Sequence, residues 1–72
     1  MQEHYYVNIN PQPWPENGEH EVHKDGCPTP PFGSNRHDLG WFSNCQDAVT
    51  AARRVYSKVD GCKNCIPQCH TR

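Results

Sequence analysis

The sequence predicts an α+β domain in which a small three-stranded antiparallel sheet packs against one α-helix, followed by a cysteine-rich metal knuckle at the C-terminus. Three short segments predicted as strands, one segment with helical spacing and the turn signals between them lead to this fold class. The chain has 72 residues, which is the size of a single domain. Only 33% of its residues are hydrophobic and five are cysteines, so we expect a thin core held by disulfides or a metal.

The predicted strands are "HYYVNI" (4–9), "EHEVHK" (19–24) and "HDLGWF" (37–42). The first is rich in aromatic and β-branched residues, which favour extended backbone, and Val22 is the only clear core candidate of the second. The segment 10–18 cannot continue the first strand, because its prolines fix φ and lack an N–H donor. A second proline-rich loop covers 28–36. In the third strand Leu39 and Trp41 are two residues apart, so we expect both to face the core.

The predicted helix covers about residues 44–58, and its apolar residues recur three, four and seven positions apart. Ser43 and Gln46 have the spacing of a capping box. Gly61 is expected to end the helix at the position after its C-cap. The expected contacts join the helix face to the sheet: Cys45, Ala48, Val49, Ala52 and Tyr56 against Val7, Val22, Leu39 and Trp41.

The segment "DGCKNCIPQCH" (60–70) contains the clearest chemical signal. Cys62 and Cys65 have the Cys-x2-Cys spacing at which two thiolates reach one tetrahedral zinc ion. Cys27 follows an Asp-Gly pair, as Cys62 does, so we interpret these two sites as arms that close on one ion. The predicted cofactor is a structural zinc ion bound by Cys27, Cys62 and Cys65. The fourth ligand is His23, Cys69 or His70.

The cysteines allow other interpretations. A Cys62–Cys69 or Cys65–Cys69 disulfide would replace the metal as the staple, and inert free thiols are the third alternative. Cys45 lies on the apolar stripe of the helix, so we expect it to pack as a small hydrophobic residue and to be dispensable for metal binding.

The N-terminus "MQEHYYVNIN" lacks the basic region and apolar run of a secretory signal, and no stretch is apolar enough to span a membrane. We therefore expect a cytoplasmic protein that does not associate with membranes. Thiols stay reduced in the cytoplasm, where cysteine clusters more often bind metal.

The order of these features resembles the metal-binding domain of the Ada DNA-repair protein over about residues 22–65. The shared pattern is His23-x3-Cys27, the extended "LGWF", a helix with Ala48 and Ala52, and Cys62-x2-Cys65. In that family Cys-x3-Cys, a strand, a helix and Cys-x2-Cys hold zinc. The resemblance implies that Cys27, Cys62 and Cys65 are zinc ligands, and it ranks His23 first as the fourth.

His23 stands where that family has its methyl-accepting cysteine. Histidine binds zinc but cannot supply the thiolate that accepts a methyl group from phosphotriesters, so the resemblance does not imply this activity. The whole chain also resembles a family of small uncharacterised bacterial proteins, through "YYVN", "GEHEVHK", "GC", "LG-F" and "CH-T". That second resemblance implies no function.

The function that we expect is a monomeric, zinc-stabilised binding or accessory module without catalytic activity, which acts on an unidentified macromolecular partner. The sequence contains no Ser-His-Asp pattern, glycine-rich phosphate loop or His-Glu-x-x-His motif. The alternative is a nucleic-acid-binding module that uses basic residues near the helix end, although a net charge of -1 disfavours it.

A second alternative is a thiol/disulfide redox protein that uses Cys62 and Cys65. Redox Cys-x-x-Cys pairs usually lie at a helix N-terminus, where the dipole lowers the thiol pKa. The predicted helix precedes Cys62, and its negative end would raise that pKa. This placement disfavours redox chemistry.

Overall fold

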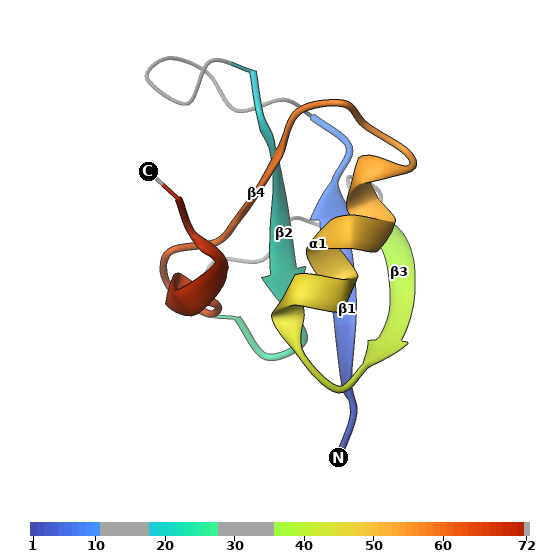
Figure 1. Ribbon diagram of the computed structural model, residues 1–72, viewed down its shortest axis with the longest axis vertical. Coiled ribbons are helices and arrows are strands. Elements are labelled where there is room, and N and C mark those ends of the chain that lie inside the picture. Colours follow the sequence, from blue (N-terminus) through green and yellow to red (C-terminus); the bar gives the residue numbers. More distant parts are fainter. Residues whose placement is uncertain (11–17, 28–35, 72) are drawn as a thin grey trace.

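The computed structural model describes residues 1–10, 18–27 and 36–71, and these form one sheet with a helix on one face (Figure 1). The elements are β1 (Glu3–Asn8), β2 (His20–Lys24), β3 (Arg36–Phe42), α1 (Cys45–Arg53), β4 (Val59–Gly61) and the 3-10 helix η2 (Pro67–Cys69). The α+β class is therefore confirmed. The two predicted loops fall mostly in 11–17 and 28–35, which lie outside the described residues.

The sheet has four strands in the order β3-β1-β2-β4. β1 pairs antiparallel with both β2 and β3, and these three strands correspond to the predicted ones. β4 pairs with β2 in parallel, so the sheet is mixed and the prediction of three antiparallel strands is wrong by one strand. A parallel neighbour requires a crossover connection. Here β3 and α1 lie within that connection.

The helix is shorter than predicted, because α1 ends at Arg53 and residues 54–58 lie outside it. Tyr56 stacks on the ring of His20 with 3.7 Å between the ring centroids. The backbone N–H of His20 also donates to the carbonyl of Lys58 at 2.9 Å. These contacts bring the chain alongside β2, where Val59–Gly61 forms β4. Gly61 is consequently a strand residue, and the prediction that it ends the helix is wrong.

The N-terminal cap of α1 is Asn44, one residue after the predicted Ser43. Asn44 has extended backbone angles, and its side-chain Oδ1 accepts a hydrogen bond from the backbone N–H of Asp47 at 2.8 Å. Asparagine is as good a cap as serine. Within the described residues, no helix has the length and apolar character needed to cross a membrane.

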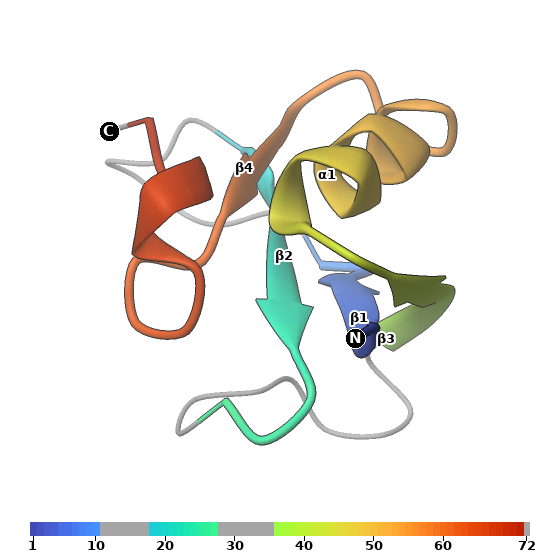
Figure 2. The ribbon, with the colours of Figure 1, turned by 60° about the horizontal axis from the view of Figure 1, so that its bottom comes forward.

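The core lies between α1 and the sheet, and it also extends under the C-terminal segment (Figure 2). Ala48, Ala52, Val7 and Val22 are fully buried and belong to one core cluster, which confirms the predicted packing of the helix face on the sheet. Among the residues that the structure describes, Ile66 is the largest fully buried side chain. It had no place in the predicted core, and its burial shows that the chain after β4 packs onto the domain as part of the same core.

Trp41 does not face the core, and 58% of it is exposed. The register between β1 and β3 shifts between Tyr5 and Tyr6, so Leu39 is an extra residue in β3. The bulge breaks the two-residue alternation on which the prediction depended. Trp41 therefore pairs with His4 on the opposite face and stacks on its ring, while Phe42 packs against the core.

Candidate metal centre

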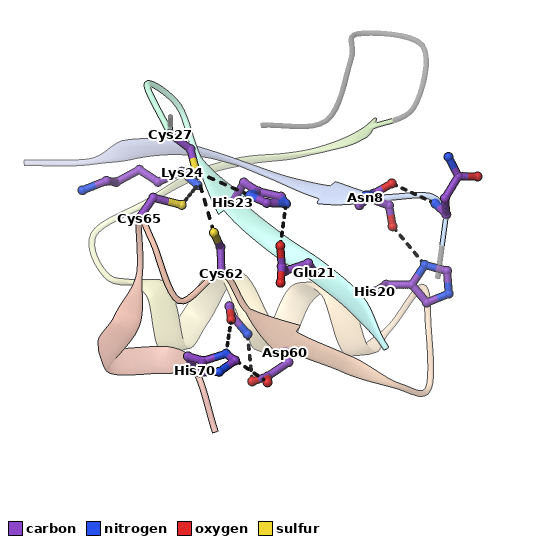
Figure 3. A network of polar contacts seen from close by, with 12 residues as sticks. Asn8, His20, Glu21, His23, Lys24, Cys27, Asp60, Cys62, Cys65 and His70 are labelled. Carbon is purple, nitrogen blue, oxygen red and sulfur yellow. Dashed lines mark hydrogen bonds and ion pairs between the residues drawn. The ribbon is translucent and has the colours of Figure 1, made fainter. Parts of the chain in front are cut away.

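Four side chains with metal-binding atoms converge at the edge of the sheet where β2 ends (Figure 3). They are His23, Cys27, Cys62 and Cys65, and their ligand atoms all lie within 4.8 Å of one another. We call these four residues the cysteine–histidine cluster. The three cysteines are the predicted zinc ligands. His23 is the candidate that was preferred for the fourth position.

The first arm of the cluster is a tight turn after β2. The backbone N–H of Cys27 donates to the carbonyl of Lys24 at 3.0 Å, which closes the turn. Gly26 has φ of 87° within it, a conformation that glycine adopts without the strain of a side chain. The turn reverses the chain, so that Cys27 Sγ lies 3.6 Å from Nδ1 of His23.

The second arm continues directly from β4. The backbone N–H of Cys62 donates to the carbonyl of Val22 at 2.9 Å, which extends the pairing of β4 with β2. The N–H of Ile66 then donates to the carbonyl of Cys62 at 2.9 Å and closes the loop that contains Cys65. The backbone N–H of Lys24 donates to Cys65 Sγ at 3.3 Å, so the first arm also supports a sulfur of the second.

The distances within the cluster fit a tetrahedral zinc ion. Two sulfurs at zinc–sulfur distances of about 2.3 Å lie about 3.8 Å apart when the coordination is tetrahedral, and a sulfur and a histidine nitrogen lie about 3.6 Å apart. The Sγ atoms of Cys27 and Cys62 are 3.7 Å apart. Cys27 Sγ and His23 Nδ1 are 3.6 Å apart. The donor set therefore fits zinc both in chemistry and in these two spacings.

Burial favours the uncharged forms of His23 and Cys65. Burial lowers the pKa of His23 to about 4, so the imidazole is neutral and can bind a metal at neutral pH. Burial, followed by contacts with Cys27 and Cys62, raises the pKa of the Cys65 thiol. A raised pKa is the opposite of what a nucleophilic or redox thiol needs. A bound cation would reverse this shift, because it stabilises the thiolates directly.

The two alternative fourth ligands lie elsewhere. Nδ1 of His70 lies 2.9 Å from the carbonyl oxygen of Gly61 and 3.3 Å from a carboxylate oxygen of Asp60. Figure 3 shows His70 turned toward Asp60 and away from the sulfurs. Cys69 is bonded to Cys45. Of the three candidates for the fourth position, only His23 joins the cluster.

Cys45 and Cys69 form a disulfide, which corrects two expectations. Cys45 is buried as predicted, but it is not a free thiol. The disulfides considered from the sequence joined Cys69 to Cys62 or Cys65, and both of these cysteines are free. Their proximity to Cys69 in the sequence was misleading, because η2 turns Cys69 toward α1 while Cys62 and Cys65 face β2.

Asp60 fastens the end of the described chain to β4. Its Oδ1 accepts hydrogen bonds from the backbone N–H and the hydroxyl of Thr71, each at 3.0 Å, and from the N–H of Gly61 at 2.9 Å. Asp60 is only 5% exposed. The carboxylate therefore holds the chain after η2 against β4, on the side of Cys62 that is away from the cluster.

Sequence reasoning missed one residue beside the cluster. Oε1 of Glu21 lies 3.3 Å from Nε2 of His23, on the edge of the ring away from the sulfurs (Figure 3). A signal was present, since residues two apart in a strand share a face. The Cys45–Cys69 pair had no comparable signal, because 24 positions separate its members.

No protein-family model matches the chain, and the searches of curated proteins and of solved structures found no significant match.

Proposed function

We propose that this protein is a zinc-stabilised binding or accessory module whose cysteine–histidine cluster holds one structural zinc ion. The convergence of four ligand atoms from two separate arms within 4.8 Å is the observation that supports the proposal. Three of these residues, His23, Cys27 and Cys62, are buried. Three uncompensated thiolates would repel one another there, so the geometry favours a cation at their centre.

Zinc is the metal that this donor set favours. Thiolates are soft ligands, and sets of three cysteines and one histidine are typical of structural zinc sites. Four protein ligands complete a tetrahedral shell and leave no position for substrate, so the proposed role is structural. The arrangement of the arms, with His23-x3-Cys27 before α1 and Cys62-x2-Cys65 after it, also supports a relationship with the Ada metal-binding domain.

The test is metal analysis of protein purified without added zinc. We expect one zinc ion per chain by elemental analysis. Replacement of zinc by Co²⁺ should give the absorption bands of tetrahedral thiolate coordination. Cys62→Ser should abolish both signals, because Cys62 is the most buried sulfur in the cluster.

The matched control is the double variant Cys45→Ala/Cys69→Ala, which removes the same element from the other cysteine pair. It should retain full metal stoichiometry, because neither residue belongs to the cluster. Wild-type protein that contains no metal and does not bind Co²⁺ would contradict the proposal.

Nucleic-acid binding is the second candidate function, and the sheet face opposite α1 is the observation that favours it. Trp41 stacks on His4 with 4.7 Å between the ring centroids, and the guanidinium of Arg36 lies 4.0 Å from the centre of the Tyr6 ring. Exposed aromatic rings beside cations are platforms for unpaired bases. Trp41 is such a ring, because 58% of it is exposed, whereas Tyr6 is buried. Salt-dependent binding of single-stranded DNA that Trp41→Ala removes would support this candidate, whereas no binding at low salt would exclude it.

A further inference from the structure

Glu21 and the cluster face opposite edges of the same imidazole. Nδ1 of His23 lies 3.6 Å from Cys27 Sγ, on the side where the proposed ion would lie. Nε2 lies 3.3 Å from Oε1 of Glu21. His23 is only 2% exposed, so its ring cannot exchange either contact freely for water. The two ring nitrogens therefore have different partners and different roles.

The strand explains why these groups meet. Glu21 and His23 both belong to β2 and are two residues apart, so their side chains leave the same face. The pairing of β2 with β1 and β4 on its two sides fixes the backbone of both residues. Glu21 is paired with Asp60 of β4, and His23 with Tyr6 of β1. The carboxylate is thus built into the sheet beside the ring that it contacts.

We propose that His23 binds the metal through Nδ1 and that Glu21 is the positioning residue whose carboxylate accepts a hydrogen bond from the Nε2–H. This inference rests on the proposed function, since it assumes that the cluster binds an ion. A metal-binding histidine commonly donates its second N–H to a carboxylate, which fixes the tautomer and the ring orientation and makes the binding nitrogen more basic. At His23 the carboxylate of Glu21 lies at Nε2 and the sulfur of Cys27 lies at Nδ1, as this arrangement requires.

The first measurement uses the wild-type protein and needs no variant. Nitrogen-detected NMR of the zinc-loaded, ¹⁵N-labelled protein assigns which imidazole nitrogen of His23 is protonated. We expect a proton on Nε2 and the chemical shift of a metal-bound nitrogen at Nδ1. A metal-bound Nε2 would overturn the inference without touching the proposed zinc site.

The second measurement is the affinity for Zn²⁺ in competition with a chromophoric chelator. Glu21→Ala should lower the affinity by roughly 10- to 100-fold, which is the usual effect of removing such a partner. Glu21→Gln retains an oxygen acceptor of the same length, so its loss should be smaller. This graded order separates the loss of the hydrogen bond from a general loss of structure.

The matched control is Glu3→Gln on the neighbouring strand β1. Glu3 forms an ion pair with Lys24, with 3.6 Å between Nζ and Oε2, and its carboxylate is more than half exposed. Its neutralisation removes the same charge and should leave the affinity unchanged. Equal affinities for wild type, Glu21→Ala and Glu3→Gln would overturn the role of Glu21, whereas a wild-type protein that binds no Zn²⁺ would overturn the proposed function and this inference together.

Discussion

The cysteine–histidine cluster and the Cys45–Cys69 disulfide hold the same C-terminal segment by different chemistry, and we call them the two fastenings. The cysteine–histidine cluster fixes Cys62 and Cys65 to the end of β2. The disulfide fixes Cys69 to Cys45, the first residue of α1. The cluster needs reduced thiols and, in our proposal, an ion, whereas the other fastening needs oxidised sulfur. One segment therefore depends on two chemical conditions, reduced thiols at the cluster and oxidised sulfur at the disulfide.

The two fastenings are alike in exposure. The cluster contains Cys62, which is 1% exposed, and the half-buried Cys65, while the disulfide joins Cys45, which is 2% exposed, to the half-buried Cys69. Cys69 also lines a cleft of about 250 Å³ between α1 and the C-terminal segment. Disulfides are typical of oxidising compartments. This bond weighs against the cytoplasmic location, which stays a prediction that thiol trapping in intact cells would test.

Removing the metal should have the largest effect. A structural zinc site contributes about 10 kcal/mol or more of apparent binding free energy, which is comparable to the total stability of a domain. Chelator titration without oxygen, followed by amide NMR, should therefore show loss of signal dispersion in 62–66 and loosening of the fold. With the disulfide intact, the signals around Cys69 should persist longer than in reductant. An unchanged spectrum without metal would show that zinc is not the staple.

Val49→Asp tests the packing of α1, the helix to which the disulfide is attached. Val49 lies on the core face of α1 and is 6% exposed. A carboxylate there would be buried without a partner, at a cost on the order of 3 kcal/mol or more. We expect the domain to unfold, as measured by circular dichroism and thermal melting. The surface change Thr50→Asp, one residue along the same helix, is the control, and a cooperatively folding Val49→Asp variant would contradict the packing of α1.

Removing the disulfide should cost less. The bond closes a loop with a sequence separation of 24, which corresponds to about 3.5 kcal/mol of loop-closure free energy at 25 °C. The variant Cys45→Ala/Cys69→Ala should lower the melting temperature while it keeps one zinc per chain. Loss of zinc from this variant with the fold intact would show that the two fastenings are coupled.

Gly61→Ala should have the smallest effect, and it acts where the two fastenings meet. An added Cβ would lie 2.8 Å from the backbone carbon and oxygen of Cys69, so η2 would have to move. Overpacking of this kind typically costs about 1–3 kcal/mol. We expect a lower melting temperature than for the exposed control Ser57→Ala. Equal melting temperatures would show that η2 is free to shift away from β4.

The sequence by itself determined those features that depend on residues close together in the chain. Three strands, the α+β class and the buried face of α1 followed from periodicity and propensity, because these features depend on neighbouring residues. The Cys62-x2-Cys65 spacing and the repeated Asp-Gly-Cys pattern likewise indicated the members of the cluster. His23 was one of three candidates for the fourth ligand, and the resemblance to the Ada domain ranked it first. The structure brings its ring to the sulfurs.

Only the tertiary structure decided the features that join distant segments. The apolar spacing at Tyr56 and Val59 fits a longer helix. Contacts with β2 instead end the helix early and place Val59 in the strand β4. A single bulge in β3 moved Trp41 to the opposite face. The choice of Cys45 as the partner of Cys69 depended on where η2 meets α1. Such pairings are set by packing between elements. The pattern of apolar residues in a sequence indicates that a residue is buried, but it does not indicate which other residue covers it.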